Sequence, residues 1–195
     1  MSLVSTEWLE KNLNKVRTID ASWHMPDSKR DAYNEYLKEH IENAVFFDLD
    51  KNSNERSALP HMLPNEEKWG KIVSDLGVKN SDHLVIYDNS DAISSCRCWY
   101  SFIYFGHDSN KVSVLDGGLI KWINEKRSTT DKIKKFDKSE YAVIENKSLV
   151  KNKKQIEKNI ALKQFELIDA RSEQRFKGLV PEPRKGLKSG HIKNS

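Results

Sequence analysis

Cysteine is scarce in this chain, since Cys96 and Cys98 are the only two among 195 residues. Two cysteines so close together cannot cross-link distant parts of a fold, which excludes a disulfide framework and favours a reducing, cytoplasmic setting. No second cysteine pair and no spaced histidine pair accompanies them, so a zinc site is not indicated. We therefore interpret both cysteines as packing residues and expect no metal and no cofactor.

Long apolar runs and concentrated charge of one sign are also missing. No run approaches the roughly 18 apolar residues of a membrane-spanning helix, and the N-terminus lacks the apolar core of a secretory signal. The net charge is only +4. The lysines between Lys132 and Lys158 alternate with acidic residues, as on a solvated surface, rather than forming the basic stripe of a nucleic-acid-binding protein. We expect a cytoplasmic protein that binds neither membranes nor nucleic acid.

The apolar runs that do occur are short and alternate with segments of helical periodicity. Continuous runs such as His83–Asp88 are typical of strands buried on both faces of a parallel sheet. Helix start signals include Ser5 and Asn65. This alternation predicts an α/β fold with a mostly parallel central sheet flanked by helices. The expected strands are residues 16–20, 45–49, 83–88 and 112–115, and the expected helices begin near residues 5, 65, 94 and 118.

A short pattern occurs twice. Asp20 precedes His40-Ile41 by 20 residues, and Asp169 precedes His191-Ile192 by 22. Internal similarity at a fixed spacing indicates duplicated units. We predict a first domain over residues 5–126, a linker over 127–147, and the start of a second domain over 148–195, with an expected strand at 165–169. The first unit continues well beyond its His-Ile element, so we expect the second to be truncated or a remnant.

Several segments in both units, in the same order, resemble tandem-domain sulfurtransferases of the rhodanese family. The resemblance implies two rhodanese-like domains, of which the first is catalytically silent. Asp88 stands where an active domain has its nucleophilic cysteine. The active cysteine would then lie beyond Ser195, and residues 1–195 alone should be inactive. The resembling segments are Asp20–Trp23, Arg30–Tyr33, Phe46–Asp50, His61–Pro64, Val114–Gly118 with Trp122, Asp169–Ser172, Arg175–Gly178, Pro181–Arg184 and Ser189–Ile192.

The resemblance also assigns roles to individual side chains. Arg175 and Arg184 match two arginines that bind the substrate, and arginine suits a small anion because its planar fork binds carboxylates in a bidentate way. Asp50 and His61 match two members of a Ser-His-Asp arrangement, in which His61 relays a proton and Asp50 orients it.

Thiosulfate-type members tend to lack both His61 and Arg184. Their presence favours 3-mercaptopyruvate as the sulfur donor. A cysteine persulfide would pass the sulfur to cyanide or to a thiol acceptor such as thioredoxin or a small thiol.

Other interpretations stay open. The donor is thiosulfate in a rhodanese proper, and a degraded second domain would leave a non-catalytic binding module. Arg175 and Arg184 could be surface arginines paired with Glu173 and Glu182. Asp48 and Asp50 also resemble the Asp-x-Asp of magnesium-dependent haloacid-dehalogenase-type phosphatases. However, Lys51 and Asn52 follow this pair, and no downstream acidic pair stands out.

Overall fold

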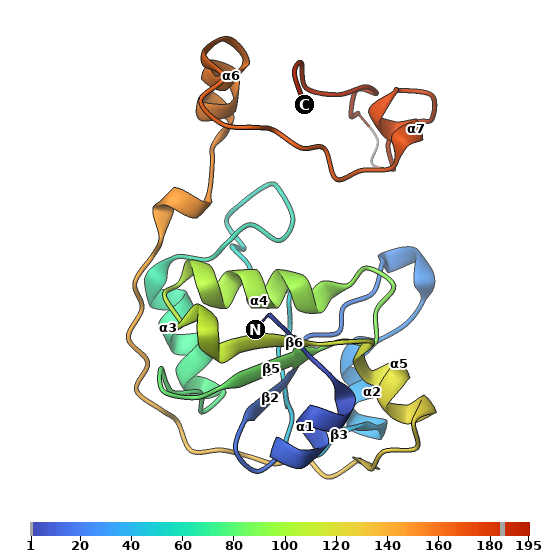
Figure 1. Ribbon diagram of the computed structural model, residues 1–195, viewed down its shortest axis with the longest axis vertical. Helices are drawn as coiled ribbons and strands as arrows, with labels where there is room; N and C mark the ends of the chain where they lie inside the picture. The colour runs from blue at the N-terminus through green and yellow to red at the C-terminus, as the bar shows by residue number, and fades with distance from the viewer. Residues whose placement is uncertain (1, 184–185) are drawn as a thin grey trace. The chain divides into compact units, whose positions relative to one another are not determined.

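The computed structural model describes residues 2–183 and 186–195 (Figure 1). Arg184, one of the two predicted substrate-binding arginines, therefore lies outside the described residues. The chain divides into two compact units, Met1–Lys147 and Ser148–Ser195. In the described ranges, no helix combines the length and the apolar character needed to cross a membrane.

The first unit is built on a five-stranded sheet in which every neighbouring pair is parallel. Its central strand β5 is buried along its whole length, as a continuous apolar run predicts for a sheet covered on both faces. The predicted α/β architecture with a parallel sheet is confirmed. In spatial order the strands are β1 (Leu3–Val4), β6 (Val112–Leu115), β5 (Leu84–Tyr87), β2 (Arg17–Asp20) and β4 (Val45–Phe46).

Helices cover both faces of this sheet (Figure 1). The two predicted caps are present, because the Ser5 hydroxyl accepts from the Trp8 N–H and the Asn65 side chain accepts from the Lys68 N–H. Helices α3 (Glu66–Asp75) and α4 (Ser94–Tyr104) contribute to one core. Helices α1 (Thr6–Asn12), α2 (Ala32–Lys38) and α5 (Gly118–Asn124) contribute to the other, and short 3₁₀ helices span Pro26–Ser28 and Ser109–Lys111.

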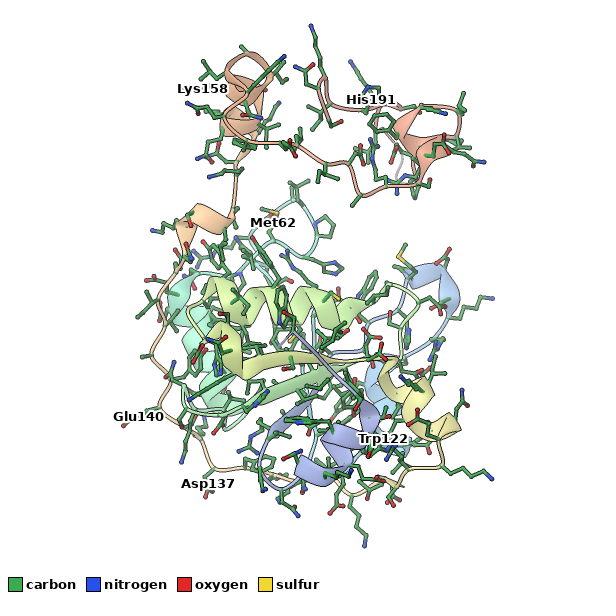
Figure 2. The ribbon with its side chains drawn as sticks, viewed as in Figure 1. Met62, Trp122, Asp137, Glu140, Lys158 and His191 are labelled. Atoms are coloured by element: carbon green, nitrogen blue, oxygen red, sulfur yellow. The ribbon has the colours of Figure 1, made fainter. Side chains whose placement is uncertain are left out.

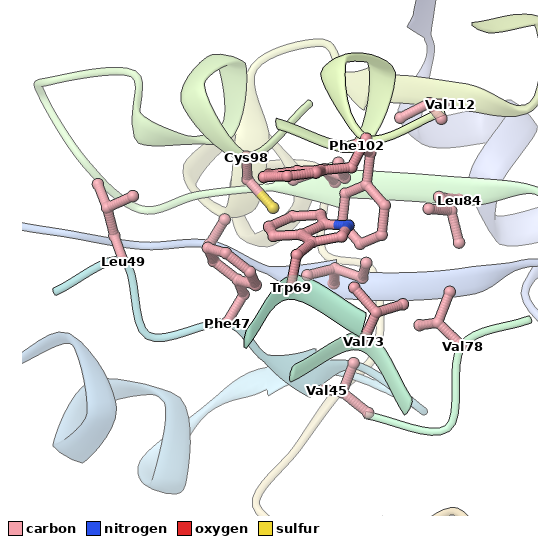
Figure 3. Close-up of a cluster of buried hydrophobic side chains, with 14 of the residues drawn as sticks. Val45, Phe47, Leu49, Trp69, Val73, Val78, Leu84, Cys98, Phe102 and Val112 are labelled. Carbon is pink, nitrogen blue, oxygen red and sulfur yellow. The ribbon is translucent and has the colours of Figure 1, made fainter. Parts of the chain in front are cut away.

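Trp69 is the centre of the first core (Figure 3). Its side chain is 1% exposed, and its ring lies 5.0 Å from the ring of Phe102 and 4.6 Å from that of Phe105. Such aromatic clusters bury large apolar areas and give α3 and α4 a fixed position on the sheet. This fixed position matters for function because α4 carries groups of the candidate site.

The two cysteines differ in their surroundings. Cys98 is fully buried in the Trp69 core, which confirms its predicted packing role, whereas Cys96 is exposed, so the same prediction for Cys96 was wrong. The two residues are separated by only one position on α4, which turns their side chains in different directions. Desolvation raises the pKa of both thiols. Neither therefore has the lowered pKa of an activated nucleophile.

Residues 127–147, predicted as a linker, run along the first unit and are called the strap here. At one end, β7 (Thr129–Thr130) pairs antiparallel with β3 (His40–Ile41). Further along, the Phe136 ring lies 3.4 Å from the guanidinium carbon of Arg17. Gly77 has a φ of 67°, and a Cβ there would come within 2.6 Å of the Phe136 Cβ. The strap is thus a packed part of the first unit.

The second unit contains helices α6 (Lys153–Leu162) and α7 (Glu173–Phe176), and the 3₁₀ helix Lys147–Leu149 spans the boundary between the two units in the sequence. The predicted strand at 165–169 is wrong, because this segment is irregular. A strand needs a neighbour that accepts and donates its backbone hydrogen bonds, and no strand occurs among the described residues of this unit. Ile168, in a position expected to be buried, is 82% exposed.

The sequence repeat nevertheless has a common local structure in both units. The His40 ring stacks on Tyr36 with centroids 4.2 Å apart, and the His191 ring stacks on Phe176 at 4.0 Å. In each pair, the histidine Nδ1 also contacts the backbone oxygen of the same aromatic residue, at 2.7 and 2.9 Å. The His-Ile elements of the two units are therefore held in the same way.

The repeated aspartates share a turn but not an environment. Asp20 accepts from the Ser22 N–H at 2.9 Å, and Asp169 accepts from the Arg171 N–H at 3.0 Å. Burial raises the pKa of Asp20 to about 6, whereas hydrogen bonds from Arg171 lower the pKa of Asp169 to about 2. The first carboxylate is thus costly to ionise in the folded protein, and the second is stabilised as an anion.

The raised pKa of Asp20 predicts a pH-dependent effect of Asp20→Asn. The folded state binds this proton more tightly than the unfolded state, so the contribution to stability is complete below about pH 4 and is lost as the pH rises through about 6. Asn keeps an acceptor for Ser22 and carries no charge. At pH 8 the variant should gain about 2–3 kcal/mol in the free energy of unfolding, a gain that disappears near pH 4.

Urea denaturation at both pH values measures this difference. Glu67→Gln, which removes a carboxylate from the exposed surface of α3, is the matched control. A gain for Asp20→Asn of equal size at pH 4 and pH 8 would show that the buried charge is not its cause.

Candidate active site

Asp50 and His61 lie in direct contact near the carboxyl end of the sheet. Asp50 belongs to the turn that follows β4, and His61 lies in the loop that leads to α3. Met62, the next residue of this loop, is labelled in Figure 2. His61 Nε2 is 2.7 Å from Asp50 Oδ1. With the N–H of Nε2 directed at the carboxylate, Nδ1 is the imidazole nitrogen left for proton exchange. The structure brings together two residues that the sequence separates by a long loop.

Two further residues contact this pair, and sequence reasoning gave neither of them a role. The Trp23 indole N–H donates to Asp50 Oδ2 at 3.0 Å, and an Arg97 N–H donates to the backbone carbonyl of His61. Trp23 lies within a segment that resembles the family, which was a signal for its importance. Nothing in the sequence near Arg97 pointed to His61.

Asp48 and Asp50 do not act together. Asp48 forms an ion pair with Lys51 at 2.9 Å, while the carboxylate of Asp50 faces His61 and Trp23. Mg²⁺ needs oxygen ligands that converge on one point, whereas these two carboxylates face different partners. Within residues 2–183 and 186–195, no three His, Cys, Asp or Glu side chains are placed to share a metal ion. The geometry therefore gives the phosphatase interpretation no support.

Asp88 directly follows the central strand β5, and its carboxylate accepts hydrogen bonds from the backbone of the loop that it begins. Its Oδ2 accepts from the Ser95 N–H at 2.7 Å, and its Oδ1 lies 3.2 Å from the Ser90 nitrogen. Backbone N–H groups in such a loop would otherwise be available to stabilise a thiolate. Here a carboxylate already uses them, so this loop offers no nucleophile.

Arg175 lies on α7, and its main partner is Glu182. Its Nε and Nη2 donate to Glu182 Oε2 at 3.2 and 2.5 Å. Of the two partners considered from the sequence, Glu173 instead pairs with Lys177. An arginine has five N–H donors, and among the described residues none accepts from the remaining three of Arg175. The guanidinium thus keeps a free edge that is able to bind an anion.

The charges around Arg175 cancel. Glu182, whose side chain is only 4% exposed, also accepts from Arg171, and Arg171 in turn contacts Asp169. Hydrogen bonds from Arg175 lower the pKa of Glu182, so both acids are ionised at neutral pH. Two carboxylates and two guanidinium groups leave this cluster with no net charge. A site for an anion built on Arg175 therefore needs a further cation, and Arg184 is the predicted one.

Comparison with known proteins connects these features. Residues 5–125 match the rhodanese-like domain family. The chain is 38% identical over 202 residues to 3-mercaptopyruvate sulfurtransferase from Mus musculus, and 37% identical over 203 residues to thiosulfate sulfurtransferase from Rattus norvegicus. Both alignments cover 100% of this chain and 67% of the relative. The two identities are too close for similarity alone to separate the two donors.

Relatives are longer than this chain. Thiosulfate/3-mercaptopyruvate sulfurtransferase 1 from Arabidopsis thaliana is 39% identical, and the match covers 99% of this chain and 56% of the relative. Among solved structures, SseA from Escherichia coli, described as a 3-mercaptopyruvate sulfotransferase with a rhodanese fold, superposes with a TM-score of 0.88 at 31% identity. That superposition covers 100% of this chain and 73% of SseA. Tum1 from Saccharomyces cerevisiae gives 0.88 at 30% identity, covering 100% and 68%.

Proposed function

This chain belongs to the rhodanese family of sulfurtransferases, and from that premise we propose that the intact protein takes sulfur from 3-mercaptopyruvate. A cysteine persulfide carries the sulfur, and a thiol or cyanide accepts it. The contact between His61 and Asp50 is the observation that carries this proposal. The nucleophilic cysteine is proposed to lie beyond residue 195, since Asp88 takes its place in the first unit and the chain spans 56–67% of the curated relatives described above.

The first half of the reaction forms the persulfide. The cysteine thiolate attacks the sulfur of 3-mercaptopyruvate, a sulfur–sulfur bond forms, and the carbon–sulfur bond breaks. Its electron pair stays with the carbon, so pyruvate leaves as an enolate and needs a proton. His61, oriented by Asp50, is proposed to supply that proton from Nδ1. Arg175 and Arg184 are proposed to hold the donor's carboxylate and carbonyl so that its sulfur faces the thiolate.

The second half returns the enzyme to its starting state. An acceptor thiolate attacks the outer sulfur of the persulfide, and the enzyme cysteine leaves as a thiolate. Thioredoxin or a small thiol is the proposed acceptor. This step needs no proton at carbon, so His61 matters mainly for the first half.

The two donors make different demands on the site. Thiosulfate releases sulfite, a stable anion that leaves without taking up a proton, whereas 3-mercaptopyruvate releases an enolate that must be protonated. A site with a positioned proton donor therefore favours 3-mercaptopyruvate. Thiosulfate sulfurtransferase activity is the second candidate function, supported by 37% identity to the rat enzyme of that name.

The donor ranking tests the proposal. In the full-length protein, kcat/KM for 3-mercaptopyruvate should exceed that for thiosulfate. The proton donor lowers the barrier to sulfur transfer from 3-mercaptopyruvate, whose enolate must be protonated, and does not lower the barrier for thiosulfate. Steady-state assays with each donor and one common thiol acceptor measure the ratio. A higher kcat/KM for thiosulfate would assign the protein to the alternative function.

A further inference from the structure

We infer that Trp23 and Arg97 are positioning residues for the Asp50–His61 pair, and that the loop of residues 88–95 supports Trp23. The inference rests on the proposed function, in which His61 moves a proton. It adds a task for a loop that holds no nucleophile in this unit.

Both side chains of the Asp50–His61 pair are accessible to solvent. The Asp50 side chain is 67% exposed and that of His61 is 23% exposed. An ion pair or hydrogen bond at such a site is weak in water, because both partners rotate freely and solvent competes for them. The 2.7 Å contact with His61 therefore needs other groups to hold Asp50 and His61 in place.

Trp23 binds the carboxylate oxygen of Asp50 that His61 does not contact. Its indole N–H donates to Oδ2 at 3.0 Å while His61 engages Oδ1, so both carboxylate oxygens have a partner. The indole also meets the imidazole edge-on, with ring centroids 4.8 Å apart and an interplanar angle of 83°. The same side chain thus fixes the carboxylate and packs against the imidazole, which limits the rotation of both.

Arg97 holds His61 through the backbone. His61 has a φ of 54°, in the left-handed region that side-chain-bearing residues adopt at a cost. The Arg97 guanidinium donates to the His61 carbonyl and is itself half-buried on the first turn of α4. Because α4 is packed against the Trp69 core, this bond ties the strained loop to a rigid helix.

The loop of residues 88–95 holds Trp23. The backbone N–H of Trp23 donates to Ser94 Oγ at 3.0 Å, and the backbone carbonyl of Trp23 accepts from the Ser90 hydroxyl. The loop is ordered in turn by Asp88, which accepts from the backbone of Ser90 and Ser95. The chain of contacts runs from Asp88 through the loop to Trp23, Asp50 and finally His61. In this unit the loop therefore supports a proton-transfer group.

Trp23→Phe in the full-length protein tests the inference, because it keeps a ring against His61 and removes the N–H to Asp50. We expect kcat with 3-mercaptopyruvate to fall by about tenfold with little change in KM, since a misplaced catalytic group slows the chemical step without weakening binding. Thiosulfate turnover should not change. The downfield imidazole N–H resonance of His61 in the proton NMR spectrum should broaden or disappear as water replaces Asp50.

Two further variants complete the test. Trp99→Phe removes an indole hydrogen bond on α4, to the carbonyl of Val112, and should leave kcat and the His61 resonance as in the wild type. Arg97→Lys should lower kcat with 3-mercaptopyruvate in the same direction as Trp23→Phe. Wild-type kcat and an unchanged resonance in both Trp23→Phe and Arg97→Lys would overturn the inference.

Failure of the proposed function gives a different result. In that case His61→Asn would leave 3-mercaptopyruvate turnover intact. The His61 resonance would still report whether Trp23 and Arg97 hold the pair: its loss in both variants would support positioning, and its persistence would refute it.

Discussion

Replacing His61 with Asn in the full-length protein is expected to lower kcat with 3-mercaptopyruvate by about 100-fold or more, because a positioned acid–base group contributes about 10²–10⁴ to the rate. Asn is smaller than His and its amide does not extend to the position of Nε2, so the variant loses the contact with Asp50 and transfers no proton. Thiosulfate turnover should stay close to that of the wild type, since sulfite leaves without a proton. Steady-state kinetics with both donors measures the two effects in one preparation.

The control for this variant is His83→Asn. His83 lies in the same unit, and its Nε2 contacts the Ser113 hydroxyl at 3.2 Å, away from Asp50. The His83→Asn variant should leave the turnover of both donors unchanged. Equal losses with the two donors in His61→Asn would indicate a structural defect, and unchanged turnover with 3-mercaptopyruvate would remove His61 from the reaction.

The second large effect is expected at the two arginines. Arg175→Ala and Arg184→Ala should each lower kcat/KM for 3-mercaptopyruvate by about 30-fold, which corresponds to about 2 kcal/mol for a charged hydrogen-bonding anchor. Arg175→Lys should be intermediate, because it restores the charge without the planar fork. The cluster of Arg175, Arg171, Glu182 and Asp169 is neutral, so loss of either arginine leaves the donor without a net positive site.

Lys177→Ala provides the matched control for the arginine variants. Lys177 follows α7 immediately and pairs with Glu173 on the surface, so its loss should not change donor kinetics. Wild-type kcat/KM in Arg175→Ala would mean that the pairing with Glu182 is the whole role of this arginine. Wild-type kcat/KM in Arg184→Ala would mean that Arg184 does not contribute to the preference for 3-mercaptopyruvate, which would then depend on His61 alone.

The fold of the first unit was readable from the sequence because its strands are short, continuous apolar runs and its helices have side-chain caps. The central strand ending at Tyr87 and the helix starting after Asn65 are examples. Helix α2 was not predicted, since only Tyr36 among its residues is buried. The strand expected at residues 165–169 has the right apolar residues but no partner strand among the described residues, and a strand depends on long-range hydrogen bonds.

The candidate site was readable only in part. Asp50 and His61 came from the resemblance to a family, and spacing alone would not have paired them. Trp23 and Asp50 are 27 positions apart, and Arg97 and His61 are 36 apart. Contacts of this kind are created by packing the elements against the sheet, and local pattern does not encode them. The packing of the strap was not predicted for the same reason, since Phe136 and Arg17 are in contact although they are far apart in the sequence.

The position of the persulfide tests the central claim most directly. The full-length protein, incubated with 3-mercaptopyruvate and no acceptor, is alkylated, digested and mapped by mass spectrometry for cysteines that have gained one sulfur atom. We expect the added sulfur on a cysteine that follows residue 195, with Cys96 and Cys98 unmodified, and no turnover from residues 1–195 alone. Sulfur on Cys96, or on no cysteine beyond residue 195, would contradict the account.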